Sequence, residues 1–394
     1  MRMNQFLQRK VSLSVLVAVL LFCSGVMGQD FRRKLSVNDT LVSPKILDGN
    51  QIRFSIYAPN AGNVLLDSYD MLGTGDGMEM TKLENGVWQT TVDSVEPGAY
   101  RYNFKMDGVT VVDPRNPKVS ESNANVSSLV YLAGNAFMDT QNVPHGAIAK
   151  VTYFSKSLNC FRRIHVYTPP DYEAGDDTFP IFYLLHGSGD CDDSWSTVGR
   201  AGFILDNLIA EKKAVPMVVV MPAGHVPMSR SDEPRDPSKP RRDGFAEDFI
   251  NDIMPYAESH YRVYTDRSHR AMAGLSMGGA QTLNIGIQNM ELFSALGVFS
   301  GGIMGIAGGG PGRGEGQSWE ERNKAKLDDA EAKKDLKLFW VAAGKDDFYI
   351  DTILTTLEVI KKHNFDVTFQ ETEGGHTWKN WRLYLNEFAP QLFR

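Results

Sequence analysis

The sequence predicts a chain of two folded parts, a small β-sandwich followed by a larger α/β unit with a mostly parallel sheet. Up to about residue 142, short segments alternate between polar and apolar side chains with a period of two. Beyond about residue 145, apolar strand-like runs alternate with helical patterns. The 394 residues, 42% of them hydrophobic and 23% charged, suffice for two hydrophobic cores.

The first part is expected to span residues 29–142. Its clearest strands are predicted at residues 51–57, 87–92 and 100–106. Turn signals such as Asn85-Gly86 and Asp107-Gly108 lie between them. Short strands at even spacing are typical of a β-sandwich, and a linker is expected near residues 134–143.

The second part is expected to span residues 143–394. Strands are predicted at residues 181–185, 217–221, 270–273, 336–342 and 366–370, and helices at 202–212, 247–261, 279–290 and 350–363. This alternation indicates a parallel sheet covered on both faces. Residues 226–242, rich in proline and charge, and the glycine-rich residues 301–316 are predicted to be long loops, either functional or simply inserted.

Residues 1–28 have the features of a secretory signal peptide. Basic residues precede an apolar run at 11–22, which is too short to span a bilayer comfortably, and small residues follow it. Phe22 stands where a lipoprotein signal has a small residue, which argues against a lipid anchor on Cys23. We therefore expect a secreted or periplasmic protein without an integral membrane segment after cleavage.

Charge and cysteine content exclude some partners and leave one question open. The net charge of -7 argues against nucleic acid as the main partner. Cys160 and Cys191 could form one disulfide in an oxidising compartment or remain buried thiols. No cluster has the spacing of metal ligands, so no metal or cofactor is expected. The oligomeric state is left open.

Ser276 is the predicted nucleophile. It lies in the run Gly274-Leu275-Ser276-Met277-Gly278, which has the pattern GxSxG, between the predicted strand at 270–273 and the helix that begins at Gly279. In this context the serine occupies a tight strand-to-helix turn and its hydroxyl is presented near a helix N-terminus. The alternative is a structural turn with an inert serine.

A serine hydroxyl needs a base to take its proton. In a strand–GxSxG–helix architecture the acid and then the histidine follow the serine in the chain. His363 lies at the polar end of a helix and is expected at the surface, whereas His376 lies in a glycine-rich loop after the strand at 366–370. We therefore expect His376 to be the general base and then the acid for the leaving group.

The carboxylate that orients the histidine should follow the strand at 336–342. Asp346 and Asp347 both qualify by position, and Asp351 is expected to cap the next helix. Position alone does not choose between the first two.

Two backbone amides are needed to stabilise an oxyanion. Met277 is expected to supply one of them. The other should come from the loop after residues 181–185, where Ser188 is the first choice and Gly187 the second. His186 is expected to fix this loop by hydrogen bonds rather than to act as a second base.

With these residues placed, the chain resembles the esterase D-like branch of the α/β-hydrolases. It is similar to bacterial feruloyl and acetylxylan esterases of carbohydrate esterase family one, over roughly residues 145–394. The residues that carry the resemblance are Leu184 to Gly187, Asp193 to Trp195, Val219 to Pro222, Glu247 to Phe249, the Ser276 motif, Gly344 to Asp347 and Gly375 to Trp378. The preceding residues resemble immunoglobulin-like carbohydrate-binding modules of family 48.

The resemblance implies an α/β-hydrolase preceded by an immunoglobulin-like sandwich. In that family the acid is the third residue after the glycine of a G-x-x-D turn, which selects Asp347. The implied reaction is a two-step acyl transfer that releases ferulate or related hydroxycinnamates from plant cell-wall arabinoxylan. Acetylated xylan is the alternative substrate, followed by an enterochelin-type siderophore, although a basic cluster for that anionic ligand is not evident near the catalytic loops.

Three tryptophans are candidates for the substrate-binding wall. Trp195, Trp378 and Trp381 could contact a phenolic acyl group or a sugar, and packing in the core is the alternative for each. Sugar binding by the sandwich itself is left open. The non-enzymatic alternative is a polysaccharide-binding protein on a hydrolase scaffold.

Overall fold

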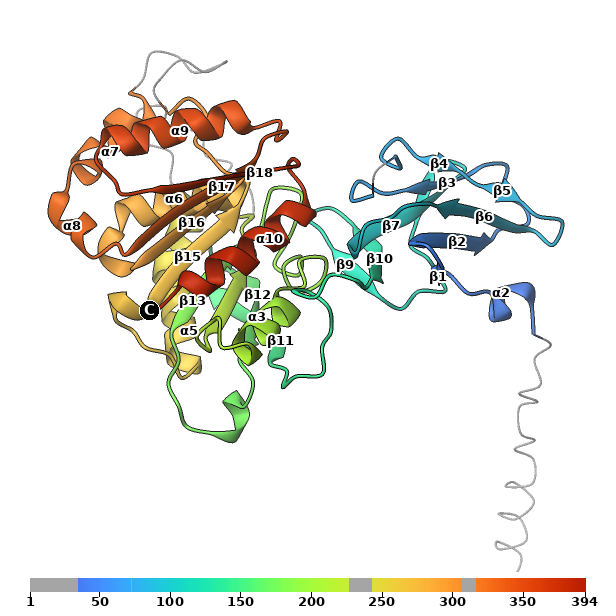
Figure 1. The fold of residues 1–394 in the computed structure, drawn as a ribbon, viewed down its shortest axis with the longest axis horizontal. Helices are drawn as coiled ribbons and strands as arrows, with labels where there is room; N and C mark the ends of the chain where they lie inside the picture. The colour runs from blue at the N-terminus through green and yellow to red at the C-terminus, as the bar shows by residue number, and fades with distance from the viewer. Residues whose placement is uncertain (1–34, 72, 227–242, 307–316) are drawn as a thin grey trace, which may run out of the picture.

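The computed structural model describes residues 35–71, 73–226, 243–306 and 317–394. They form a β-sandwich and a larger α/β unit, which lie beside each other along the longest axis (Figure 1). The predicted signal peptide and Cys23 lie outside the described residues, as do residues 227–242 and 307–316 of the two predicted loops.

The sandwich is built from two antiparallel sheets. Their strand orders are β1-β2-β6-β5 and β4-β3-β7-β10-β9, with β8 paired to β7. The strands are β1 (Lys45–Leu47), β2 (Gln51–Tyr57), β3 (Val64–Asp67), β4 (Met78–Glu79), β5 (Thr81–Lys82), β6 (Val87–Val92), β7 (Gly98–Met106), β8 (Val109–Val111), β9 (Val119–Glu121) and β10 (Val126–Leu132). Alternate residues of β2, such as Ile52 and Phe54, are buried against Tyr102 and Phe104 of β7, so the period-two pattern reflects a shared core.

The α/β unit has one eight-stranded sheet of order β11-β12-β14-β13-β15-β16-β17-β18. Its first two strands are antiparallel to their neighbours, and the strands from β14 to β18 run parallel. The strands are β11 (Ala147–Ser155), β12 (Cys160–Thr168), β13 (Ile181–Leu185), β14 (Val218–Pro222), β15 (Arg270–Leu275), β16 (Ala295–Phe299), β17 (Leu338–Gly344) and β18 (Thr368–Thr372).

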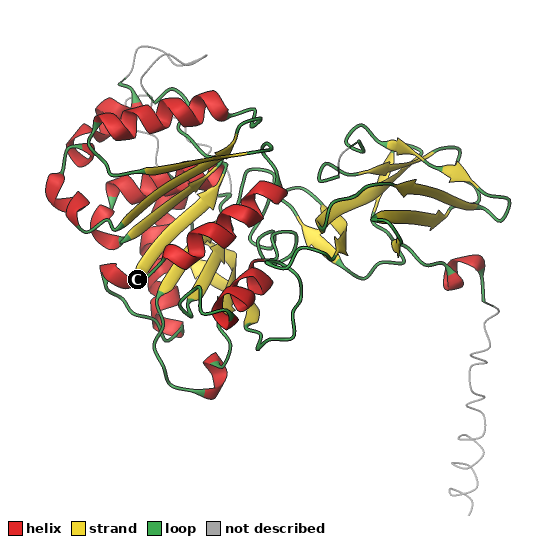
Figure 2. Ribbon diagram, viewed as in Figure 1, coloured by secondary structure: helices red, strands yellow, loops and turns green. Residues whose placement is uncertain are grey.

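Helices cover both faces of this sheet (Figure 2). The α-helices are α2 (Val37–Thr40), which precedes the sandwich, and α3 (Ala201–Ala210), α4 (Gly244–Asp248), α5 (Met254–His260), α6 (Met277–Gln288), α7 (Trp319–Leu327), α8 (Ala330–Lys334), α9 (Ile350–Lys362) and α10 (Trp378–Phe388). Ile181 and Tyr183 of β13 face the core beneath α6 and α9, whereas Phe182 and Leu184 face the core beneath α3 and α10. Burial on both faces explains why β13 is apolar throughout.

The predicted elements agree closely with the observed ones. Strands β2, β6 and β13 have the predicted bounds, and α9 ends one residue before the predicted limit. The single helix predicted at 247–261 is α4 and α5 joined by a π-helical turn, Phe249–Ile253. The expectation that Asp351 caps α9 is wrong, because Tyr349 is the N-cap residue and Asp351 lies in the first turn.

Two further properties concern the described part of the chain. None of its helices is both long and apolar enough to cross a membrane. Cys160 and Cys191 are free thiols, and burial raises the pKa of the Cys191 thiol to about 11.

Candidate active site

Ser276 lies at the junction between β15 and α6. Its backbone angles, φ 51° and ψ −112°, are unusual for a residue with a side chain and store strain. Two features hold this turn: the Ser276 N–H donates to the Phe299 carbonyl at 2.8 Å, and Gly274 packs directly on Gly278. A Cβ atom on Gly274 would lie 2.4 Å from the Gly278 carbonyl carbon, so only glycine fits there.

The structure brings Ser276, His376 and Asp347 together in one chain of hydrogen bonds. His376 Nε2 lies 2.9 Å from Ser276 Oγ, and His376 Nδ1 lies 3.0 Å from each carboxylate oxygen of Asp347. If Nδ1–H donates to the carboxylate, Nε2 carries a lone pair that can accept the serine proton. This arrangement suits general-base activation of a hydroxyl.

Asp347 is suited to stay ionised although it is buried. Burial raises its pKa, but hydrogen bonds from His376 and from the Tyr349 N–H, at 2.9 Å, outweigh that effect and hold the pKa below its usual range. Asp346, which also qualified by position, is exposed. The structure therefore pairs Asp347, and not Asp346, with His376.

The two residues expected to supply the oxyanion amides lie in segments next to Ser276. Met277 is the first residue of α6, so its N–H has no carbonyl partner within the helix. The loop after β13 lies against Ser276, since a Cβ atom on Gly187 would lie 3.4 Å from Ser276 Cβ. Ser188 follows and is exposed.

His186 anchors this loop, as expected. Its Nδ1 lies 2.8 Å from the Gly187 carbonyl, and its Nε2 accepts the Gly224 N–H at 2.8 Å. Burial lowers the pKa of His186, which favours the neutral ring that these two contacts require. Both ring nitrogens are occupied, so His186 is not available as a second base.

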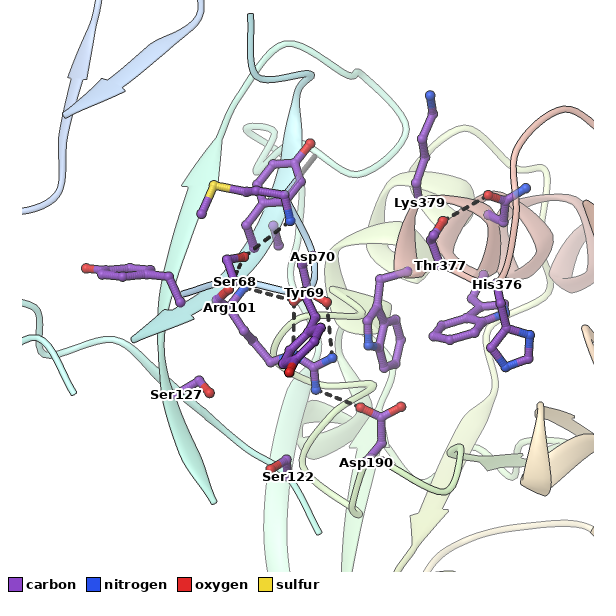
Figure 3. Close-up of a pocket in the computed structure, with 18 of the residues that line it drawn as sticks. Ser68, Tyr69, Asp70, Arg101, Ser122, Ser127, Asp190, His376, Thr377 and Lys379 are labelled. Atoms are coloured by element: carbon purple, nitrogen blue, oxygen red, sulfur yellow. Dashed lines mark hydrogen bonds and ion pairs between the residues drawn. The ribbon is translucent and has the colours of Figure 1, made fainter. Parts of the chain in front are cut away.

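A pocket of about 860 Å³ opens beside Ser276 and His376 (Figure 3). Residues of both parts of the chain line it, including Tyr69 and Arg101 from the sandwich and Asp190 and Trp378 from the α/β unit. The candidate site is therefore not confined to the α/β unit.

The three candidate tryptophans differ in their surroundings. Trp378 and Trp381 are among the lining residues, although each exposes little surface. The wall interpretation is wrong for Trp195, which is fully buried and donates its Nε1–H to the Leu185 carbonyl at 3.0 Å. Its ring packs against Trp378, so core packing is its role.

Sequence reasoning missed two kinds of residue at the pocket. Phe348 is 81% exposed and its ring centre lies 4.6 Å from that of His376. Its position directly after Asp347 was an available signal. Arg101 and Asp190, by contrast, meet only because the two parts pack together, and no sequence pattern marks them.

The surface location expected for His363 is wrong. The side chain is buried, with Nδ1 2.7 Å from Asp328 and Nε2 3.0 Å from Glu320. These contacts tie the end of α9 to α7 and the residue after it, so His363 has a structural role far from Ser276 in the fold. Among the described residues, no group of three or more His, Cys, Asp or Glu side chains could hold a metal ion.

Fold and site together define an α/β-hydrolase in which a serine on a strand-to-helix turn faces a histidine and an aspartate. The chain belongs to the Esterase family, whose model matches residues 155–392. A second model, carbohydrate-binding module 48 (isoamylase N-terminal domain), matches residues 41–119.

Relatives and solved structures agree with this assignment. An endo-1,4-beta-xylanase/feruloyl esterase of Xylanibacter ruminicola is 29% identical over 359 residues, covering 89% of this chain and 46% of that protein. The chain thus spans less than half of that relative's length, and 23% of the next, endo-1,4-beta-xylanase Y of Acetivibrio thermocellus. A ferulic acid esterase of Anaeromyces mucronatus superposes with a TM-score of 0.55 at 26% identity, over 66% of this chain and 96% of its own.

Solved structures of an enterobactin esterase match across both parts of the chain. The enterobactin esterase of Shigella flexneri has a TM-score of 0.59 over 87% of this chain and 93% of its own. Its sequence identity of 18% restricts the likeness to the fold.

Proposed function

We propose that this chain is a serine carboxylic-ester hydrolase that acts through an acyl-enzyme. Ser276 attacks the ester carbonyl while His376 takes its proton and Asp347 holds the imidazole. The amides of Met277 and Ser188 stabilise the tetrahedral oxyanion. The alcohol leaves with a proton from His376, and a water activated by the same ring releases the acid.

The observation that carries this proposal is the continuous hydrogen-bond chain from Ser276 Oγ through His376 to Asp347, at the wall of an open pocket. A structural serine turn would need neither the histidine nor the buried carboxylate behind it. The strained angles at Ser276 also fit a nucleophile, since such strain clusters at active sites.

We infer that the substrate is a ferulate or related hydroxycinnamate ester of arabinoxylan. The relatives named for feruloyl esterase activity support this class. The aromatic surroundings of His376 support it too: Phe348 lies on one side, and Trp381 makes an edge contact with ring centres 5.1 Å apart. Aromatic rings pack well against a planar phenolic acyl group.

The charges at the pocket favour a neutral sugar ester over an anionic siderophore. Five carboxylate residues are among the lining residues, namely Asp67, Asp70, Asp93, Glu96 and Asp190. Three cations also line the pocket: Arg101 binds two carboxylates, Lys379 pairs with Glu96, and Arg382 is buried and donates to backbone carbonyls, so the carboxylates outnumber the cations. A triply catecholate ligand would meet uncompensated negative charge here.

We also propose the division of the chain and its destination. Residues 29–142 form the carbohydrate-binding-module-like sandwich, residues 143–394 form the esterase domain, and residues 1–28 direct export to the periplasm or the medium. A polymeric cell-wall substrate is consistent with a secreted enzyme.

The decisive experiment combines one variant with a substrate panel. Ser276→Ala should keep the fold and lose essentially all hydrolysis, and near-normal rates in that variant would rule out the mechanism. Wild-type rates are then compared on methyl ferulate, feruloylated arabino-oligosaccharide, acetylated xylo-oligosaccharide and a catecholate siderophore. A preference of more than about tenfold for acetyl over feruloyl esters would overturn the substrate assignment.

A further inference from the structure

Residues of the sandwich form hydrogen bonds with the loop that follows β13 along much of its length. The Asn123 N–H donates to the Gly189 carbonyl at 3.2 Å, and the Glu121 N–H donates to Asp193 Oδ2 at 2.8 Å. Further along, the hydroxyls of Ser120 and Thr197 are hydrogen-bonded at 2.7 Å. The loop that contains Ser188 is therefore fixed from outside the α/β unit.

Arg101 of β7 makes a charged contact in this interface. Asp70 accepts its Nε–H at 3.0 Å, its Nη2–H at 3.2 Å and its backbone N–H at 2.9 Å. The remaining Nη1 donates to Asp190 Oδ1 at 2.7 Å (Figure 3). Because Asp70 holds the guanidinium plane from the sandwich side, the Nη1–H of Arg101 points toward the loop.

Asp190 in turn belongs to the turn that carries Ser188. Its N–H donates to the Gly187 carbonyl at 3.1 Å and closes the turn around Ser188. A Cβ atom on Gly187 would lie 3.4 Å from Asp190 Oδ2 and 3.4 Å from Ser276 Cβ. The carboxylate that Arg101 binds is thus separated from the nucleophile by little more than the Gly187 backbone.

We propose that Arg101 is a positioning residue that holds the turn from Gly187 to Asp190 and so directs the Ser188 amide toward the oxyanion. The inference rests on the proposed function. In this arrangement the sandwich completes the catalytic site of the α/β unit, because Asp70 and Arg101 both lie in the sandwich. Arg101 acts through Asp190 and not on the reacting atoms.

The test uses the full chain and three variants. Arg101→Gln and Asp190→Asn each remove the charge of one partner in the contact, and Lys150→Gln is the matched control. Lys150 forms a half-exposed ion pair with Glu121 across the same interface, at 3.0 Å, and does not line the pocket. Initial rates are measured with 4-nitrophenyl acetate and methyl ferulate, together with inhibition by a trifluoromethyl ketone, which forms a tetrahedral adduct with a negatively charged oxygen.

We expect kcat to fall tenfold or more in Arg101→Gln and Asp190→Asn while KM changes less than threefold. Loss of one oxyanion donor costs roughly 10²- to 10³-fold, and a misplaced donor should cost part of that. The inhibition constant of the ketone should rise by the same factor as kcat/KM falls. The double variant should be at most twofold slower than the slower of the two single variants, because both changes act on the same contact. Lys150→Gln should stay within twofold of wild type.

Three results would overturn the inference: kcat within twofold of wild type in both variants, a rise in KM with unchanged kcat, or additive losses in the double variant. If Arg101→Gln does not fold, Asp190→Asn, which preserves side-chain shape, tests the same contact alone. Failure of the proposed function looks different, since wild type itself would then hydrolyse neither ester or Ser276→Ala would remain active.

Discussion

At the scale of single residues, the site depends on how each side chain is held. His376 contacts Ser276 and Asp347 and lies between the rings of Phe348 and Trp381, so its plane is restricted on several sides. The Asp347 carboxylate suits the tautomer in which Nδ1–H is the donor, and its hydrogen bonds hold its pKa below the usual range. Substitution of this carboxylate should therefore affect chemistry more than folding.

Asp347→Asn should lower kcat by a factor on the order of 10³ to 10⁴, with KM almost unchanged. The amide can donate to Nδ1 and so stabilise the tautomer in which Nε2 carries the proton and cannot accept one from Ser276. Steady-state rates on methyl ferulate measure the effect. Asp346→Asn is the matched control, because Asp346 is adjacent and exposed, and its rate should stay within twofold. Equal losses in the two variants would contradict the assignment of Asp347.

At the scale of elements, the sequence is most informative where a pattern is local. The GxSxG run, the glycine-rich loop around His376 and the G-x-x-D turn each lie within a few residues, and these local patterns led to the side chains that the structure brings together. Strand β13 was equally predictable, because a strand buried on both faces is uniformly apolar.

The contacts that escaped prediction depend on packing between distant segments. Arg101 and Asp190 are 89 positions apart, and the ordinary alternation of β7 gives no sign of their pairing. The prediction that Trp195 lines the pocket was wrong for a related reason. A tryptophan in a loop can face the pocket or the core, and only the path of the chain after β13 decides for the core.

Asp192 also holds the loop after β13, and its contribution to the stability of the fold should depend on pH. Asp192 is buried and accepts hydrogen bonds from Arg163 Nε at 2.6 Å and from His165 Nδ1 at 2.8 Å. Burial alone would raise its pKa, but these partners lower it to about 2. A carboxylate with a lowered pKa in the folded state stabilises the fold above its unfolded pKa, near 4, and loses that effect as the pH falls toward 2.

Asp192→Asn should therefore lower the free energy of unfolding by about 2 kcal/mol at pH 7. Urea unfolding of wild type and variant between pH 7 and pH 3 measures the difference. The difference should be constant from pH 7 to pH 5 and shrink below about pH 4, because the carboxyl then takes up a proton in the unfolded state while it stays ionised in the folded state. Asp176→Asn changes an exposed carboxylate and should have little effect at any pH. A difference that stays constant down to pH 3 would rule out this carboxylate as the source.

At the scale of the whole molecule, the sandwich and the α/β unit share an interface that includes the candidate site. Arg382 of α10 is buried, and its Nη1 donates to the Ala99 carbonyl of β7 at 3.2 Å and to the Val198 carbonyl at 2.8 Å. Burial lowers its pKa to about 10. Because α10 begins two residues after His376, β7 borders both the loop after β13 and the loop that contains His376. The sandwich wall of the pocket is therefore in a fixed place relative to Ser276.

This geometry predicts that two aromatic residues contact different parts of the substrate. Phe348 lies against His376 and should contact the acyl group of any bound ester. Tyr69, 88% exposed, lies on the sandwich wall of the same pocket, where an aromatic face can stack on a sugar ring (Figure 3). Tyr69→Ala should lower kcat/KM about tenfold for feruloylated arabino-oligosaccharide and less than twofold for methyl ferulate, which has no sugar. Phe348→Ala should lower kcat/KM for both substrates by similar factors. Equal losses on the two substrates in Tyr69→Ala, or none on either, would mean that the sugar does not reach the sandwich wall.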